Sequence, residues 1–120
     1  ATTEETIAAA TAAAVQMIAP PFVVVFTKSG FSARVVAARR PGVPILVLTD
    51  VERTYRQMAL VWGVMPLLVA QCDNYEAMWE LAHQELLRRG LAERGDRVIV
   101  TAGYPFDVPG TTNLMRVELV

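Results

Sequence analysis

Three short runs of β-branched and aromatic residues constrain the fold of this chain more than any other feature. They read FVVVFT at 22–27, PILVLT at 44–49 and GDRVIVTAG at 95–103. None of them shows the regular alternation of apolar and polar residues that marks a strand with one face in water. Strands of this kind are buried on both faces and are typical of parallel sheets with helices packed on either side. We therefore expect an α/β fold.

Segments with helical character separate these runs. Helices are predicted over 2–18, 29–39, 51–62 and 73–89. The residues placed to cap helix starts are Thr2 or Thr3, Asp50 and Asp73. One face of the last helix carries apolar residues at core-facing spacing, namely Tyr75, Met78, Ala82 and Leu86. Strands that alternate with helices in this way form a parallel sheet with right-handed crossovers.

Two further strands complete the predicted sheet. A weaker strand at 64–70 contains Pro66, and a last strand at 113–120 follows a loop too short for a helix, so it should run antiparallel to its neighbour. The last strand alternates, with Met115, Val117 and Leu119 on its apolar side, and its mixed polarity is typical of a sheet edge. The predicted fold is one three-layer α/β/α domain over 1–120, whose five-stranded mixed sheet has four parallel strands and one antiparallel strand.

Composition argues against several classes of function. The 120 residues carry a net charge of −1, which gives no electrostatic reason to expect nucleic acid or an anionic membrane as a partner. One cysteine and one histidine cannot make a disulfide or a tetrahedral zinc site. No apolar run approaches the roughly 20 residues of a membrane-spanning helix. The acidic start ATTEETIAAA is unlike a signal peptide, so we expect a cytoplasmic domain.

The richest candidate binding site follows the first buried strand. Its members are Thr27, Lys28, Ser29, Gly30 and Ser32, at the point where that strand passes into a helix. Backbone N–H groups at a helix start favour anions, the hydroxyls donate hydrogen bonds, and Lys28 adds a positive charge. A phosphate monoester would satisfy this set, which we call the 27–32 loop. The structural alternative is that Ser29 caps the helix and Gly30 eases the turn.

A second loop is a candidate lid over that site. It spans 103–112 and includes Gly103, Tyr104, Pro105, Gly110 and Thr111. Loops of this length in compact domains are more often functional than idle, although a rigid connector is the alternative. The other conspicuous residues have structural interpretations: His83 as a partly exposed surface residue, Cys72 as a buried thiol, and Trp62 and Trp79 as core or interface residues.

Several motifs, in this order, resemble the C-terminal domain of pyruvate kinase. They are F-T-K-S-G-F-S-A-R at 26–34, R-P-G-V-P-I at 40–45, W-G-V-M-P at 62–66, G-D-R-V-I-V-T-A-G at 95–103 and P-G-T-T-N at 109–113. The resemblance covers essentially the whole chain. It implies a five-stranded mixed sheet whose last strand is antiparallel, beside a (β/α)8 barrel that transfers a phosphoryl group from phosphoenolpyruvate to ADP with Mg²⁺ and K⁺.

The resemblance also implies roles for the residues above. In many members of the family the loop matching Thr27, Lys28, Ser29, Gly30 and Ser32 holds the phosphate of a sugar-phosphate effector, and the loop matching 103–112 closes over the ligand. The last strand, with Met115, Val117 and Leu119, lies near a two-fold axis of a tetramer. The barrel is missing from these 120 residues, so the chain alone is predicted to be inactive, without catalytic, metal or cofactor residues.

One departure from the family pattern bears on the ligand. Phe31 stands where many relatives have a basic residue, and the helix at 73–89 offers cations only at its end. A second phosphate would lack a partner, which is costly in a partly buried site. We therefore expect a monophosphate or an unspecific anion. Two alternatives remain at this stage: an assembly module that binds no ligand, and a phosphosugar enzyme that uses Asp50, Asp73 or Asp107 as its base.

Overall fold

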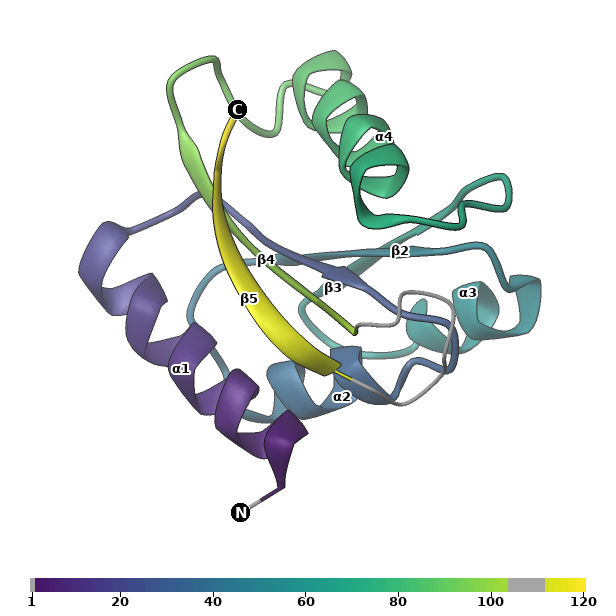
Figure 1. The fold of residues 1–120 in the computed structure, drawn as a ribbon, viewed down its shortest axis with the longest axis horizontal. Helices are drawn as coiled ribbons and strands as arrows, with labels where there is room; N and C mark the ends of the chain where they lie inside the picture. Colours follow the sequence, from purple (N-terminus) through teal and green to yellow (C-terminus); the bar gives the residue numbers. More distant parts are fainter. Residues whose placement is uncertain (1, 104–111) are drawn as a thin grey trace.

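A five-stranded sheet forms the centre of the computed structural model, which describes residues 2–103 and 112–120 (Figure 1). Its strands are β1 (Val23–Phe26), β2 (Ile45–Thr49), β3 (Val64–Leu68), β4 (Arg97–Gly103) and β5 (Thr112–Leu119). They lie in the order β3-β2-β1-β4-β5. The first four strands run parallel, and β5 pairs antiparallel with β4. The predicted mixed sheet is confirmed.

Helices cover both faces of this sheet. They are α1 (Thr3–Ile18), α2 (Phe31–Ala38), α3 (Glu52–Met58) and α4 (Tyr75–Arg88). Figure 1 shows α4 on one side of the sheet and α1, α2 and α3 on the other. The three predicted layers are therefore confirmed.

The position of the central strand β1 explains why its sequence does not alternate between apolar and polar residues. Val24 and Phe26 belong to the core cluster on the α4 side, and Val23 and Val25 to the cluster on the side of α1, α2 and α3. All four residues of β1 are buried. Because each face of the strand meets a helical layer, every position is apolar.

The two edge strands differ from the centre as their sequences predict. The residues of β3 are half-buried or exposed, and Pro66 is tolerated there because an edge strand does not need every backbone N–H for pairing. On β5, Met115 packs partly against the core on the α1 side, whereas Val117 and Leu119 are 49% and 67% exposed. The predicted edge position of the last strand is confirmed.

Some predicted helix boundaries and caps are wrong. The helix predicted over 51–62 ends at Met58, and Val51 rather than Asp50 holds its N-cap position. Asn74 rather than Asp73 caps α4, because the Asn74 side-chain oxygen accepts the Ala77 N–H at 2.8 Å. Thr2 does cap α1, through a reciprocal pair of hydrogen bonds with Glu5. The predicted core stripe of α4 is confirmed as buried.

The tryptophans have different environments. Trp79 is partly buried against the α4-side core and stacks on His83, with 5.6 Å between ring centroids. Trp62 is 94% exposed, which excludes a place in the core, so its role in an interface stays a prediction. Cys72 is buried, as expected. Among the described residues, no helix is both long and apolar enough to cross a bilayer.

A hydrogen bond from α4 to β5 ties the edge strand to the helical layer. The Tyr75 hydroxyl donates to Glu118 Oε2 at 2.7 Å, and the Arg116 guanidinium lies 4.8 Å from the centre of the Tyr75 ring. Burial, followed by the bond to Glu118, raises the pKa of Tyr75. Folding therefore favours the protonated phenol.

Tyr75→Phe should weaken this tie and change the response to alkaline pH. We expect a loss of about 1.5 kcal/mol in the free energy of unfolding near neutral pH, because the lost bond has a charged acceptor. Because the pKa of Tyr75 is raised above its ordinary value of about 10, the native chain loses stability as pH rises above that value. Urea denaturation near pH 7, 9 and 11 should show a smaller alkaline loss for the variant. Parallel pH profiles for the two proteins would contradict this account.

Candidate functional site

The 27–32 loop lies where the strand order of the sheet reverses. From β1 the chain moves outward to β2 and β3, and it then returns to β4 on the other side of β1. In open α/β sheets, ligands bind outside the carboxyl ends of the strands at such a switch point. The loop after β1 and the carboxyl end of β4 therefore flank the expected crevice. Gly103 ends β4, but Tyr104, Pro105, Gly110 and Thr111 lie outside the described residues.

A tight turn joins β1 to α2. The Gly30 N–H donates to Thr27 Oγ1 at 2.9 Å, and the Phe31 N–H donates to Ser29 Oγ at 3.3 Å. Gly30 has φ +86°, a left-handed conformation that favours glycine. A Cβ atom at Gly30 would lie 2.9 Å from Met58 Cε. Gly30 itself holds the N-cap position, so the structural alternative in which Ser29 is the N-cap of α2 is wrong in that detail, although the Ser29 hydroxyl does accept the Phe31 N–H at the start of the helix.

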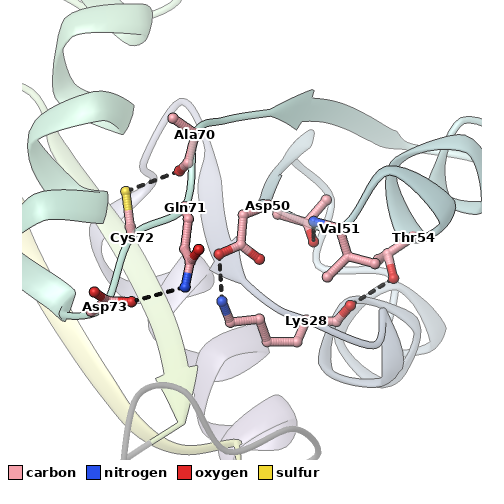
Figure 2. Close-up of polar contacts among 9 residues, drawn as sticks. Lys28, Asp50, Val51, Thr54, Ala70, Gln71, Cys72 and Asp73 are labelled. Carbon is pink, nitrogen blue, oxygen red and sulfur yellow. Dashed lines mark hydrogen bonds and ion pairs between the residues drawn. The ribbon is translucent and has the colours of Figure 1, made fainter.

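Lys28 is held at both of its ends. Its ammonium forms an ion pair with Asp50, and its carbonyl accepts the Thr54 hydroxyl at 2.6 Å (Figure 2). The side chain of Lys28 is 20% exposed and that of Asp50 only 6%. The cation of the loop is therefore neutralised by a carboxylate of the same chain.

Ser32 connects the loop to the other side of the expected crevice. Its hydroxyl is hydrogen-bonded to the hydroxyl of Thr112, 80 residues away at the start of β5, and both residues are buried. In the first turn of α2, the N–H groups of Ser32 and Ala33 donate to no described residue. Such first-turn N–H groups, at the positive end of the helix dipole, are the groups that bind anions in other proteins.

Beside the loop lies a polar cluster at the ends of β2 and β3. Gln71 Nε2 donates to Asp73 Oδ1 at 3.4 Å, and the Cys72 thiol donates to the Ala70 carbonyl at 3.3 Å (Figure 2). Burial and then the nearby Asp50 carboxylate raise the pKa of Cys72, which keeps it a thiol and a poor nucleophile. In the part of the chain that the structure describes, no three His, Cys, Asp or Glu side chains are grouped to hold a metal ion.

The structure brings most of the predicted loop residues together and adds three contacts that the sequence did not predict. Asp50 was expected to cap a helix or to act as a base, and its pairing with Lys28 was not expected, nor were the contacts of Thr54 and Thr112. A signal for Asp50 did exist. It directly follows the second buried run, as Lys28 follows the first, and neighbouring parallel strands end at the same edge of a sheet. Asp107, the third candidate base, lies outside the described residues.

Comparisons with known proteins agree with this architecture. The family described as "Pyruvate kinase, alpha/beta domain" matches residues 5–118. The chain is similar to pyruvate kinases from Agrobacterium vitis (45% identical over 112 residues, 92% of this chain and 24% of the relative) and Methylorubrum extorquens (34% over 119 residues, 99% and 25%). A third, from Lactobacillus delbrueckii subsp. bulgaricus, is 37% identical over 98 residues, 82% of this chain and 17% of the relative.

The chain therefore spans a quarter or less of the length of these relatives. The match nevertheless covers nearly every described element, from α1 to β5, and the sheet is the five-stranded mixed sheet with an antiparallel last strand that the resemblance implied. The chain belongs to the family of pyruvate kinase C-terminal alpha/beta domains.

Proposed function

We propose that this chain is the regulatory and subunit-contact domain of a cytoplasmic pyruvate kinase, and that its 27–32 loop binds the phosphate group of an effector. The parent enzyme would transfer a phosphoryl group from phosphoenolpyruvate to ADP in a barrel, with Mg²⁺ and K⁺, outside these 120 residues. Family membership supports the first part. One observation carries the second: a lysine and first-turn N–H groups that have no partner among the described residues lie together at the switch point of the sheet.

Each group in the loop has a place in phosphate binding. The N–H groups of Ser32 and Ala33 would donate to phosphate oxygens, and the exposed Ser29 hydroxyl would add a third donor. Lys28 would supply the charge. Regulation would follow if the ligand binds one conformation of the enzyme more tightly than another, because it then shifts the population toward that conformation.

The cations near the loop favour a monophosphate. Phe31 presents a half-exposed apolar ring at the start of α2. On α4, Arg88 lies at the end of the helix and is paired with Glu85. A second phosphate would therefore find no cation at Phe31 and, on α4, only an arginine that Glu85 already pairs with, so we expect a hexose bisphosphate to bind no more than about tenfold tighter than the monophosphate. Submicromolar binding of the bisphosphate would contradict this.

Calorimetry and thermal melting with inorganic phosphate and a hexose monophosphate test the proposed site. At one hundred times its Kd, a ligand should stabilise the folded chain by about 2.7 kcal/mol. Sodium chloride at equal ionic strength is the control, since it supplies charge screening without a dianion. Equal melting temperatures in phosphate and chloride would remove the support for an effector site and favour an assembly role.

An assembly role has its own supporting observation. Val117 and Leu119 are exposed apolar side chains on β5, an edge strand that pairs on one side with β4. Exposed edges of this kind pair with other chains unless they are protected. We propose that two copies associate around β5 in a symmetric dimer, in which Met115 remains partly buried within its own chain.

Val117→Asp should convert such a dimer into a monomer. A carboxylate at this position would lose water on association and repel its symmetry mate. Light scattering after gel filtration measures the mass directly. Leu60→Asp is the matched control, because Leu60 is 88% exposed and lies outside β5. A Val117→Asp dimer as stable as the original would point to the helices as the contact.

A further inference from the structure

We propose that the Asp50 carboxylate is an internal competitor for the ligand of the 27–32 loop: it pairs with Lys28 and so restricts the site to dianions. This inference rests on the proposed phosphate site and adds a residue that determines its specificity. It starts from the ion pair that joins the ends of β1 and β2 (Figure 2).

The register of the sheet places the two members of this pair side by side. Phe26 of β1 lies opposite Leu48 of β2, and the Thr27 N–H continues the ladder to the Leu48 carbonyl. Lys28 and Asp50 each follow two residues later, so the same parallel pairing delivers both to one edge of the sheet. Backbone pairing therefore brings Lys28 and Asp50 to neighbouring positions, within reach of an ion pair.

The two partners differ in their freedom to move. The Asp50 side chain is 6% exposed, and its short stem cannot carry the carboxylate into water. Lys28 is more exposed and has a flexible four-carbon stem. Thr54 holds the Lys28 carbonyl, which fixes the backbone but leaves the side chain free to turn. A ligand would therefore recruit the ammonium of Lys28, and the Asp50 carboxylate would stay in place.

Asp50 consequently sets the charge that a ligand needs. A carboxylate ligand offers Lys28 one negative charge, which Asp50 already provides, and it must also overcome the cost of association. A phosphate monoester carries between one and a half and two negative charges near pH 7. It can attract Lys28 more strongly than Asp50 does while also using the N–H groups of Ser32 and Ala33.

The neighbouring residues offer Asp50 no other cation. Among the described residues, Lys28 alone forms an ion pair with it, and the Cys72 thiol beside it is neutral. The carboxylate thus opposes any anion that draws Lys28 away. Removing this carboxylate should strengthen anion binding in general and weaken the preference for dianions.

The test compares the wild-type chain with Asp50→Asn, using calorimetric titrations of inorganic phosphate and of acetate. We expect phosphate to bind roughly fivefold or more tightly to the variant, about 1 kcal/mol by the affinity relation. We also expect the ratio of phosphate to acetate affinity to fall. The control is Glu52→Gln, which removes an equal charge two residues away at an exposed side chain paired with Arg56, and should leave both affinities unchanged.

The possible outcomes distinguish a failure of the proposed phosphate site from a failure of the competitor role of Asp50. Phosphate binding to the wild type, with equal or weaker binding to Asp50→Asn, would overturn the competitor role and leave the phosphate site intact. Binding to neither protein would overturn both. Binding to the variant alone would show that Asp50 opposes anions, but it would overturn the proposed phosphate site of the unaltered chain. Should the variant fail to fold, the Asp50 carboxyl ¹³C shift of the wild type serves instead: phosphate should move it as Lys28 departs, and an unmoved signal at saturation would contradict the inference.

Discussion

Lys28→Met is expected to abolish phosphate binding and to lower the free energy of unfolding by about 3 kcal/mol. The large loss of stability follows from burial, because the Asp50 side chain is 6% exposed and Lys28 is its ion-pair partner. Removing one member of a buried pair leaves a charge with neither water nor a counter-charge. Urea denaturation and a phosphate titration measure the two effects separately.

Two further variants separate the contribution of the Lys28–Asp50 ion pair to stability from other effects of Lys28→Met. Lys28→Met combined with Asp50→Asn should recover most of the stability, since no buried charge remains, but should still fail to bind phosphate. Arg56→Met breaks the exposed pair with Glu52, in which both side chains are about two-thirds exposed, and should cost less than about 0.5 kcal/mol. A Lys28→Met variant as stable as Arg56→Met would show that the pair with Asp50 contributes little.

Leu86→Ala should be comparably destabilising, by about 3 kcal/mol. Leu86 is fully buried on the face of α4 that packs against the sheet, in the same cluster as Val24 and Leu46. The change removes apolar contacts and leaves a cavity that the central strands cannot collapse to fill. Thermal and urea denaturation should report the loss, with little change in the affinity for phosphate because α4 lies on the other face from α2.

Leu60→Ala provides the matched comparison. Leu60 is 88% exposed after α3, so the same chemical change should alter the free energy of unfolding by less than about 0.5 kcal/mol. Equal effects for the two leucines would contradict the packing of α4 on the sheet. An effect of Leu86→Ala on phosphate affinity, with stability unchanged, would also be inconsistent with this structure.

The core of the sheet could be predicted because its signal is local. Uninterrupted apolar runs such as the one at 22–27 require helices on both faces, and the apolar stripe of α4 falls at helical spacing. The N-cap residue of α4 was harder to predict, because Asp73 and Asn74 are adjacent and both side chains can accept a hydrogen bond. The backbone conformation of a single residue decides between them, and it depends on how the chain leaves β3.

The candidate site could be located but not assembled from the sequence. The 27–32 loop was placed correctly because the end of a buried strand and the start of a helix are both local features. Its internal partners come from 22 and 80 residues away, through Asp50 for Lys28 and Thr112 for Ser32. Strand order and register determine those contacts, and short sequence motifs carry no information about either.

An NMR titration of the ¹⁵N-labelled chain with inorganic phosphate tests the central claim most directly. The account predicts saturable shifts that are largest at the backbone amides of Ser29, Ser32 and Ala33, together with a change in the Lys28 side-chain signals. Shifts that do not saturate, or that are largest at amides remote from the carboxyl end of β1, would show that the 27–32 loop does not bind phosphate.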